Sequence, residues 1–405
     1  MKIAITGAGL AGLAAASFLR KQGHDVTVFE RNQKIEGRGL GILLQPLGQS
    51  VLKQLGVLDE IIASGLRLNG VEIDHLVNHK SQTISNVHYK DVERDMFGIG
   101  IRRPKLFDIL LKQAENLGVN FVANCDIQDA VLKGEQRELI DSNGTDRGSF
   151  DLVVDGSGYR SPLRQKYATI THQTTYPDNA VCGTVEDDHS LPDSITKETV
   201  YRYAGKDMFT VIPVGKDPAT GKDLLSFFWA VRGKEYDPKN FDMAAWKKEV
   251  LSFMPQMKTY LDQVTNQSQL VFAHYSDVAL EPHHVDRLAF IGDSAHSTSP
   301  FIGQNASMGF VDALVLAKAL QRSTNVKQAL DTYSADRKDQ VKFEQGYSRT
   351  MTDVFRSVSL PVVFYRDHLM AKIMHIPGMT KLFGRMTVRG EQPLKKSILH
   401  DKYGI

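Results

Sequence analysis

Cysteine is scarce in this sequence. Of 405 residues only Cys125 and Cys182 carry thiols, so a framework of several disulfides is excluded, and we expect both thiols to pack in the interior of a cytoplasmic protein. Long apolar runs are also lacking, and without a run of about 18 such residues no membrane-spanning helix is predicted. Neither sign of charge dominates, since 49 Lys and Arg accompany 47 Asp and Glu, and this balance gives no indication of a nucleic-acid partner.

The length and composition indicate a globular protein with more than one domain. A chain of 405 residues is too long for one core of ordinary size, and two domains are expected. Hydrophobic residues make up 42% and charged residues 24% of the chain, which are the proportions of water-soluble domains. The sequence contains no internal repeat and no low-complexity segment, so local patterns must indicate the fold.

The first thirty residues alternate between strand and helix patterns. Residues 2–6 predict a short buried strand, 11–22 a helix that ends near Gly23, and 25–30 a second strand, which together indicate a βαβ unit and a parallel sheet. The basic start and the apolar stretch after it are also compatible with a secretory signal. The glycine spacing argues against that alternative, because it fits a nucleotide-binding turn.

Three glycines between the first strand and the helix have the spacing G-x-G-x-x-G. Gly7 permits the tight turn, Gly9 lets a pyrophosphate approach the backbone, and Gly12 lets helix and strand pack closely. Glu30 ends the second strand 18 residues beyond Gly12, where its carboxylate can accept hydrogen bonds from ribose hydroxyls. The pattern predicts dinucleotide binding. A glycine turn without a ligand is the alternative, and the motif does not distinguish FAD from NAD.

The centre of the chain has a β-rich texture. Between 180 and 232, four short β-like runs are separated by turn residues, which predicts an inserted antiparallel sheet. Asn143-Gly144 predicts a hairpin turn. The other predicted elements are helices at 47–64 and 104–117, a strand at 150–158, a helix at 243–264, a strand at 287–293 and a helix at 305–323.

Two further glycine motifs follow predicted strands: Asp155-Gly156 and Gly292-Asp293. A carboxylate just beyond a buried strand, as in Asp293, can bind a hydroxyl-rich chain such as ribityl. The ordered set of three motifs resembles the FAD-dependent aromatic-ring monooxygenases of the para-hydroxybenzoate and salicylate hydroxylase type. The resemblance covers nearly all of residues 1–340. Smaller matches are the run from Arg38 to Ile42, Arg103, and the pair Tyr333 and Arg337.

The resemblance implies an α/β architecture, with a Rossmann-like FAD-binding domain, an inserted antiparallel-sheet substrate domain and a C-terminal helical segment. The FAD-binding domain would be discontinuous, because the substrate domain interrupts it twice. The implied boundaries are 1–75, 98–175 and 275–340 for the FAD-binding domain, 76–97 and 176–274 for the substrate-binding domain, and 341–405 for the C-terminal helical extension.

The resemblance also assigns roles in the cofactor site. The first glycines and Glu30 would hold the ADP half of FAD, Asp293 the ribityl chain, and the loop after Pro300 would lie beside the isoalloxazine ring. Asp155 and Gly156 would contact both FAD and NAD(P)H. The residues assigned to the cofactor are Gly7, Gly9, Gly12, Glu30, Arg31, Arg38, Arg103, Asp155, Gly156, Asp293, Pro300, Phe301, Gly303, Asn305, Ala306 and Ser307.

One segment departs from the family pattern. The family reads G-Q-G-x-N-x-G where this chain has Asn305 in place of a glycine and Ser307 in place of an asparagine. Asparagine tolerates left-handed backbone angles and serine caps helices, so we expect FAD binding to survive. The departure bears on flavin mobility and on the efficiency of hydroxylation.

The family chemistry explains why no catalytic acid, base or nucleophile is visible. NADPH or NADH would reduce FAD, oxygen would add at the flavin C4a, and the hydroperoxide would transfer OH to an electron-rich aromatic or other hydrophobic small molecule. We expect the substrate between the inserted sheet and the flavin, although core packing is the alternative role of the candidate side chains. Those candidates are Gln45, Tyr201, Tyr203, Phe209, Phe227 and Trp229.

Other functions remain open or are disfavoured. The same fold serves flavoprotein reductases that do not hydroxylate, and the altered segment at 303–309 suggests a non-catalytic FAD-dependent binding protein as a further alternative. A halogenase is disfavoured because its W-x-W-x-x-I motif is missing. His296 is expected to be packed or hydrogen-bonded rather than part of a hydrolase triad, and His283-His284 lack the spacing of a metal site.

The C-terminal segment 351–390 combines apolar residues with bases, and Pro361 and Pro377 should break it into short helices. A helical appendage that closes the substrate domain is one interpretation, since most amphipathic helices face a core. Peripheral contact with an acidic lipid surface, or with a prenyl-like substrate, is the other. We expect a monomer or a homodimer.

Overall fold

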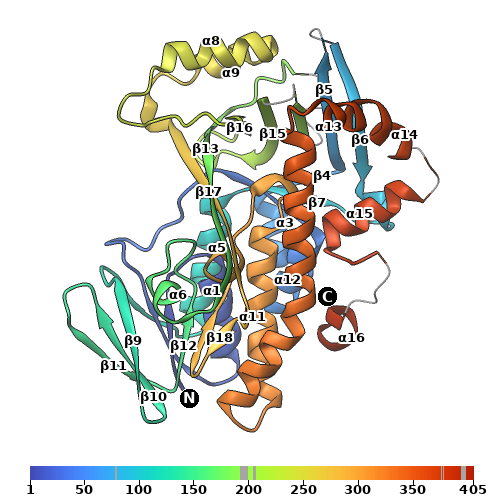
Figure 1. Ribbon diagram of the computed structural model, residues 1–405. Helices are drawn as coiled ribbons and strands as arrows, with labels where there is room; N and C mark the ends of the chain where they lie inside the picture. The colour runs from blue at the N-terminus through green and yellow to red at the C-terminus, as the bar shows by residue number, and fades with distance from the viewer. Residues whose placement is uncertain (78–79, 192–198, 204–206, 375, 377, 394–397) are drawn as a thin grey trace.

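The N-terminal pattern forms the parallel sheet that it predicts. The computed structural model (Figure 1) describes residues 1–77, 80–191, 199–203, 207–374, 376, 378–393 and 398–405. Its first sheet has the order β18-β19-β12-β1-β2-β8 and is parallel except at the β18–β19 edge. The strands are β1 (Lys2–Thr6), β2 (Asp25–Phe29), β8 (Asn120–Val122), β12 (Leu152–Asp155), β18 (His284–Val285) and β19 (Leu288–Phe290).

Different layers cover the two faces of this sheet. Ile3 and Ile5 pack against helices, whereas Ala4, between them, faces a small antiparallel sheet. The hairpin predicted at Asn143-Gly144 joins two strands of that small sheet. The helical layer contains α1 (Leu10–Lys21), α2 (Pro46–Leu55), α5 (Arg103–Asn116) and α11 (Asn305–Arg322), and the opposite layer contains β9 (Ile127–Lys133), β10 (Gln136–Asp141), β11 (Asp146–Phe150) and α6 (Pro162–Tyr167).

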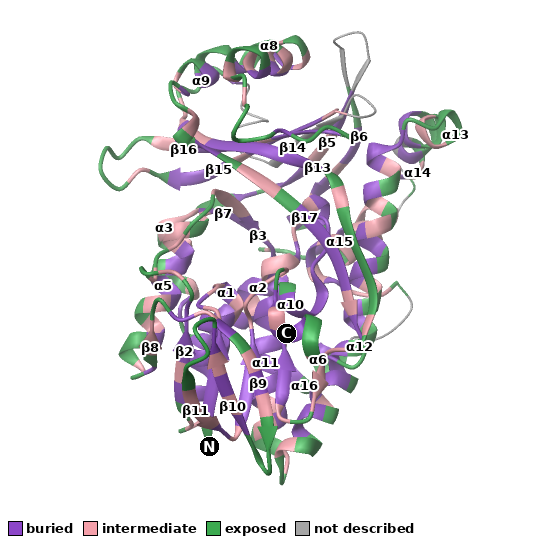
Figure 2. Ribbon diagram, turned by 60° about the vertical axis from the view of Figure 1, so that its left-hand side comes forward, coloured by how far each residue is buried: buried purple, intermediate pink, exposed green. Residues whose placement is uncertain are grey.

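A seven-stranded sheet forms the second domain, in the order β17-β13-β16-β15-β14-β5-β6. Its strands pair antiparallel except for β14 and β5. Two helices lie over one face of it, as Figure 2 shows. The elements are β5 (Gly70–Val77), β6 (Lys80–His88), β13 (Ile170–Glu186), β14 (Thr199–Tyr203), β15 (Asp207–Lys216), β16 (Asp223–Val231), β17 (Leu270–Leu280), α8 (Met243–Phe253) and α9 (Lys258–Asp262).

A third sheet connects the two domains. The three strands β3 (Gly41–Leu44), β7 (Gly98–Arg102) and β4 (Leu66–Leu68) pack against β15. Backbones come so close here that a Cβ at Gly100 would collide with the carbonyl oxygen of Pro213. Only glycine fits such a contact. The remaining short elements are α3 (Leu58–Ser64), α4 (Tyr89–Val92), η1 (Pro255–Met257), η2 (Gln267–Gln269), α10 (Asp293–His296) and η3 (Pro300–Ile302).

Several predicted element bounds are wrong for local reasons. The helix predicted at 47–64 is two helices, because Gly56 ends α2 with a left-handed φ of 87°. The helix predicted at 243–264 is interrupted where Pro255 begins a 3₁₀ turn. The predicted domain boundaries after residues 75, 175 and 274 fall inside β5, β13 and β17. The strand β5 belongs along its whole length to the seven-stranded sheet, whereas β13 and β17 run on from that sheet to the core of the first domain.

The C-terminal region begins with one long helix. The helix α12 spans 31 residues, so the boundary predicted after residue 340 falls inside it. Pro361 stands in the first turn of α13 as predicted, and Pro377 lies outside the described residues. In the part of the chain that the structure describes, no helix could span a membrane. The helices are α12 (Val326–Arg356), α13 (Leu360–Phe364), the π-helical η4 (Tyr365–Met370), α14 (Ala371–Met374), α15 (Met379–Arg389) and α16 (Ile398–Tyr403).

Buried charges fix α11 and α12 behind the Gly292 turn. Asp312 is fully buried, accepts hydrogen bonds from Arg337 Nε (2.6 Å) and from the backbone N–H of Gly292 (2.7 Å), and lies 2.6 Å from His296 Nε2. Burial alone would raise the pKa of Asp312, but His296 and Arg337 hold it well below its usual range. The expectation that His296 is packed and hydrogen-bonded is confirmed.

A second buried carboxyl lacks such partners. Glu344 of α12 is 2% exposed, and neither of its oxygens has a hydrogen-bond partner among the described residues. Burial raises the pKa of Glu344 to about 8, against a smaller lowering by Arg337. The folded protein therefore holds a proton on this side chain at neutral pH.

We expect the stability to fall as the pH rises because of Glu344. Its ordinary pKa is 4.5, and a pKa raised by folding contributes stability that is complete below the unfolded value and is lost as the pH rises through the folded value. Glu344→Gln, which cannot ionise, should flatten the decline of Tm between about pH 5 and pH 8. Wild type and variant with the same pH dependence in thermal denaturation would contradict this assignment.

Candidate functional site

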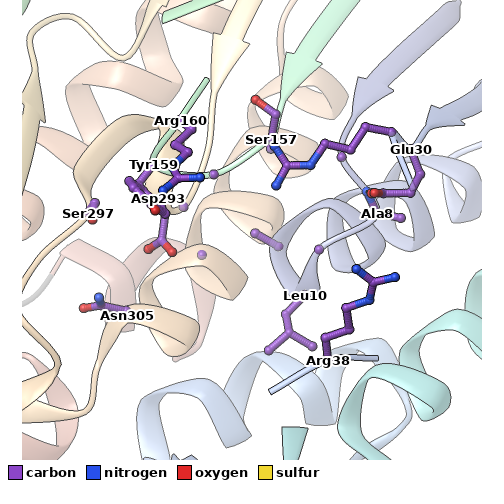
Figure 3. A pocket seen from close by; sticks show the side chains of 18 of the residues that line it. Ala8, Leu10, Glu30, Arg38, Ser157, Tyr159, Arg160, Asp293, Ser297 and Asn305 are labelled. Atoms are coloured by element: carbon purple, nitrogen blue, oxygen red, sulfur yellow. The ribbon is translucent and has the colours of Figure 1, made fainter. Parts of the chain in front are cut away.

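A cavity of about 700 Å³ lies between the parallel sheet and the seven-stranded sheet. Its lining begins at the turn between β1 and α1 and ends against β16 and β17. Figure 3 shows Glu30, Ala8 and Arg38 on one side of it, and Asp293 and Asn305 on the other. The volume lies in the range of roughly 300–1,000 Å³ that is usual for ligand sites. A long two-part ligand could therefore bind across both domains.

The first glycine turn leaves the backbone open to the cavity. A Cβ at Gly7 would lie 2.7 Å from the carbonyl oxygen of Gly156, whereas a Cβ at Gly9 would meet only that oxygen, at 3.9 Å. Gly7, Gly9 and Gly156 line the cavity. Gly12 does not, since it packs against the backbone of Gly7. The turn thus has the space and the free N–H groups that a pyrophosphate requires.

Glu30 and a group of bases surround the same end. The Glu30 carboxylate accepts hydrogen bonds from the backbone N–H of Ala8 (2.9 Å) and of Asn32 (3.0 Å), and a carboxylate has further lone pairs for ribose hydroxyls. The guanidinium of Arg103 donates to the carbonyl of Arg38 (3.0 Å). The bases that line the cavity are Arg31, Lys34, Arg38, Arg103 and Arg160, and they suit an anionic ligand.

Asp155 has a different place from the one expected. Its side chain is fully buried and accepts hydrogen bonds from Thr6 Oγ1 (2.9 Å), from Ser157 N and Oγ (3.0 and 2.6 Å), and from Ser161 Oγ. It is not among the described residues that line the cavity, although Gly156 is. A carboxylate with this many partners positions the loop, and of the predicted pair Asp155 and Gly156 it is Gly156 that faces the cavity.

The far side of the cavity is formed by the turns around α10 and the start of α11. Asp293, Pro300, Asn305 and Ala306 line it, and Asp293 is exposed there. Within the described lining, three of the residues expected beside the flavin are missing. These are Phe301, Gly303 and Ser307.

The departure at 303–309 has a structural explanation that sequence reasoning missed. Asn305 is the first residue of α11, and its side-chain amide donates to the carbonyl of Thr298 (2.9 Å). The left-handed residue is Gly303, with φ 66°. Ser307 lies inside the first helical turn, buried, with no partner for its hydroxyl among the described residues. The expected left-handed asparagine and serine cap are therefore both wrong; Asn305 instead joins the loop to the helix.

The predicted substrate aromatics lie on the wrong face of the sheet. Phe209, Phe227 and Trp229 are at most 2% exposed and pack against residues of α8 and α9, away from the cavity. Gln45 is buried and accepts a hydrogen bond from Tyr89 (2.9 Å), outside the cavity lining. The side chains of Tyr201 and Tyr203 lie outside the described residues.

The residues that do face the cavity from the sheet are their neighbours. Phe228 lies between Phe227 and Trp229 and lines the cavity, as does Tyr275 of β17, and the two rings stack with centroids 6.3 Å apart. Successive side chains of a strand point to opposite faces, so the sequence indicated that Phe228 lies on one face of the sheet and Phe227 and Trp229 on the other. It could not show which face carries the helices. Ser157, Ser276, Ser297 and Thr298 were also missed.

The fold and this cavity define a two-domain dinucleotide-binding protein with a separate substrate sheet. Residues 1–343 match the FAD binding domain family, and the chain belongs to that family. This confirms the expected FAD cofactor and the expected class of flavoprotein oxidoreductase, whose similar relatives are monooxygenases.

Individual relatives are distant but cover most of the chain. Kynurenine 3-monooxygenase of Salinispora tropica is 25% identical over 83% of this chain and 76% of its own length. The 3-amino-4-hydroxybenzoate 2-monooxygenase of Streptomyces cremeus is 25% identical over 95% of both chains. An HpxO variant from Klebsiella pneumoniae, solved with FAD, has a TM-score of 0.79 at 20% identity over 98% of this chain and 100% of its own. The expected fold is thereby confirmed.

We expect Phe227 and Phe228 to differ when each is replaced by alanine. Phe227→Ala removes a ring buried between Phe209 and Trp246, and it should cost about 3–5 kcal/mol of unfolding free energy. Phe228→Ala should change stability much less but alter the absorbance of FAD bound in the cavity. Denaturation curves and flavin spectra of the two variants provide the measurement, and equal stability losses would contradict the assignment of faces.

Proposed function

We propose that the protein hydroxylates an aromatic or other electron-rich hydrophobic small molecule with O₂ and NADPH or NADH, using FAD in the cavity, in the cytoplasm. One observation carries this proposal: a single cavity joins a dinucleotide turn to the inner face of a separate sheet. The named activities of relatives on kynurenine and on an aminohydroxybenzoate support an aromatic substrate. As before, a monomer or a homodimer is the predicted assembly.

The described residues fit FAD along the whole cavity. In this proposal the N–H groups around Gly9 and the bases Arg38 and Arg103 hold the pyrophosphate, Glu30 holds the adenosine ribose, and Asp293 holds the ribityl chain. FAD supplies the redox chemistry, since it takes a hydride from NAD(P)H and activates oxygen. The chain itself binds, orients and excludes water, and its cavity contains no residue that we assign as acid or base.

A flavoprotein that does not hydroxylate is the second candidate. Asn305 ties the first turn of α11 to Thr298 by its amide, where the related hydroxylases are expected to have a glycine. This contact restrains the segment that lies beside the proposed flavin ring. A reductase, or a binding protein that keeps FAD in one position, would need no movement there.

The purified protein should contain FAD and oxidise NADPH faster when a phenol that it hydroxylates is present. Asp293→Ala should lose most of the FAD, because a hydrogen bond to a charged acceptor contributes about 1.5–3 kcal/mol, while the circular dichroism stays unchanged. Flavin content, NADPH consumption and product analysis distinguish the candidates. A colourless protein that cannot be reconstituted would contradict FAD binding, and NADPH oxidation without hydroxylated product across a panel of phenols would favour the reductase.

We further propose that the tip formed by α13, η4 and α14 contacts anionic membranes. Apolar side chains gather here on the surface: Leu360 is 82%, Val358 62% and Phe364 56% exposed. Lys372 and Lys381 are exposed near them, and such a mixture of apolar side chains and bases suits an acidic lipid surface. In Figure 1 these helices form an outer edge of the molecule, next to β6.

Replacing Leu360 and Phe364 together by serine should abolish binding to vesicles that contain phosphatidylserine, and the wild type should bind them at low salt only. Co-sedimentation measures both. The control is Leu132→Ser, which removes an exposed apolar residue from β9 (41% exposed) far from the tip. Wild-type protein that stays in the supernatant at low salt would show that the tip has a structural role only.

A further inference from the structure

The inner face of the seven-stranded sheet carries an apolar cluster beside the cavity. Ala180 and Cys182 of β13 and Ala230 of β16 present small buried side chains on this face, in one cluster with Tyr275 and Phe301. Phe301 follows Pro300, which lines the cavity. Phe228 and Tyr275 are the rings that line the cavity where it meets this face of the sheet, and a flat, apolar ring bound in the cavity would lie against them.

One buried cation lies at this cluster without a full set of partners. Arg356, the last residue of α12, is 4% exposed, pairs through Nη1 with the carboxylate of Asp178, and lies with Cζ 5.6 Å from the ring centre of Phe301. Its Nε and Nη2 donate to no acceptor among the described residues. Buried donors without acceptors are costly. Nε and Nη2 also form the edge of a guanidinium that binds oxygen acceptors in two parallel hydrogen bonds.

A second donor without a partner is close to Arg356. The hydroxyl of Tyr275 is buried and has no hydrogen-bond partner in the described part of the chain, and its ring lines the cavity between Phe228 and Tyr176. Arg356 pairs with Asp178 of β13, and the residue after Asp178, Asn179, lies opposite His274, the neighbour of Tyr275 in β17. The two groups are therefore near each other, and burial raises the pKa of Tyr275 well above its usual range. The hydroxyl of Tyr275 therefore remains a donor at neutral pH.

We propose that Arg356 and Tyr275 anchor the substrate by binding an oxygen acceptor, a carbonyl or a carboxylate, attached to its aromatic ring. This inference rests on the proposed function and names the substrate class. The three free donors belong to side chains that adjoin one apolar cluster, Arg356 over the ring of Phe301 and Tyr275 at the cavity wall, so a ring held by its oxygen substituent would be fixed in orientation. Asp178 already balances the charge of Arg356, so a neutral ketone can satisfy the site as well as a carboxylate can.

The alternative is that Arg356 only joins α12 to β13 through Asp178. The two roles use different atoms of the guanidinium. Nε and Nη2 would bind the substrate, whereas Nη1 forms the ion pair with Asp178. Arg356→Met removes the ion pair with Asp178 and the Nε and Nη2 donors together. Arg356→Lys keeps a positive charge beside Asp178 but loses these two donors. Asp178→Asn weakens the ion pair and leaves the two donors in place.

Three small phenols that differ in one substituent test the proposal on the FAD-loaded protein. Salicylate carries a carboxylate, 2-hydroxyacetophenone a neutral carbonyl, and 2-methylphenol no oxygen acceptor. Titration of each against the flavin absorbance gives Kd without any turnover. The better of the two oxygen-bearing phenols should bind about tenfold or more tightly than 2-methylphenol, since hydrogen bonds to a charged donor contribute about 1.5–3 kcal/mol, and which of the two binds better identifies the acceptor.

Arg356→Met and Arg356→Lys should each lose most of this preference and leave the Kd of 2-methylphenol unchanged, Tyr275→Phe should lose part of it, and Asp178→Asn should keep it while lowering Tm. The proposal is overturned if folded Arg356 variants keep the preference, if Asp178→Asn loses it as fully as they do, or if none of the phenols perturbs the flavin at millimolar concentration. Because every titration uses protein that retains FAD and oxidises NADPH, such a result would leave the proposed flavin function standing.

Discussion

Asp155 connects the three glycine turns on which the cofactor site depends, two through its carboxylate and one through its backbone carbonyl. Thr6, which donates to it, directly precedes the first turn, and Ser157 and Ser161 belong to the second. The third turn is tied to the same residue, because Ser294 Oγ donates to the backbone carbonyl of Asp155 (2.6 Å). A buried carboxylate is tolerated only when its oxygens are satisfied, so the three turns hold one another in register.

The helix α12 connects the two domains by charge in both of its halves. In its first half, Arg337 pairs with Asp312 in the FAD-binding domain. Near its end, Arg349 pairs with Asp277 of β17 (2.5 Å) and Arg356 with Asp178 of β13. A helix of 31 residues is about 46 Å long at 1.5 Å per residue. The two sheets therefore have a rigid link on one side of the cavity, and the short strands β3, β4 and β7 provide the link on the other.

Local patterns in the sequence were enough for the parallel strands around the first turn, for the family and for part of the cavity wall. Gly7, Gly9 and Glu30 could be assigned because tight turns and strand ends impose spacing within some thirty residues. The roles of Asp155, Asn305 and Phe228 could not, because each depends on what a distant segment places next to it. Tyr333 shows the same limit: its spacing from Arg337 was recognisable, but its hydroxyl donates to the carbonyl of Phe290 (2.7 Å), a contact that no local pattern reveals. Arg356 stood in a segment that composition presented only as basic and apolar.

The two thiols are buried in different domains, Cys125 next to β9 and Cys182 in the middle of β13. Burial raises the pKa of both, and the neutral thiol is a poor nucleophile. An alkylating dye would therefore label each cysteine only while its own surroundings are open. Each domain thus contains one cysteine that reports on its own local unfolding. The order in which Cys125 and Cys182 are alkylated under mild denaturant would show which domain opens first.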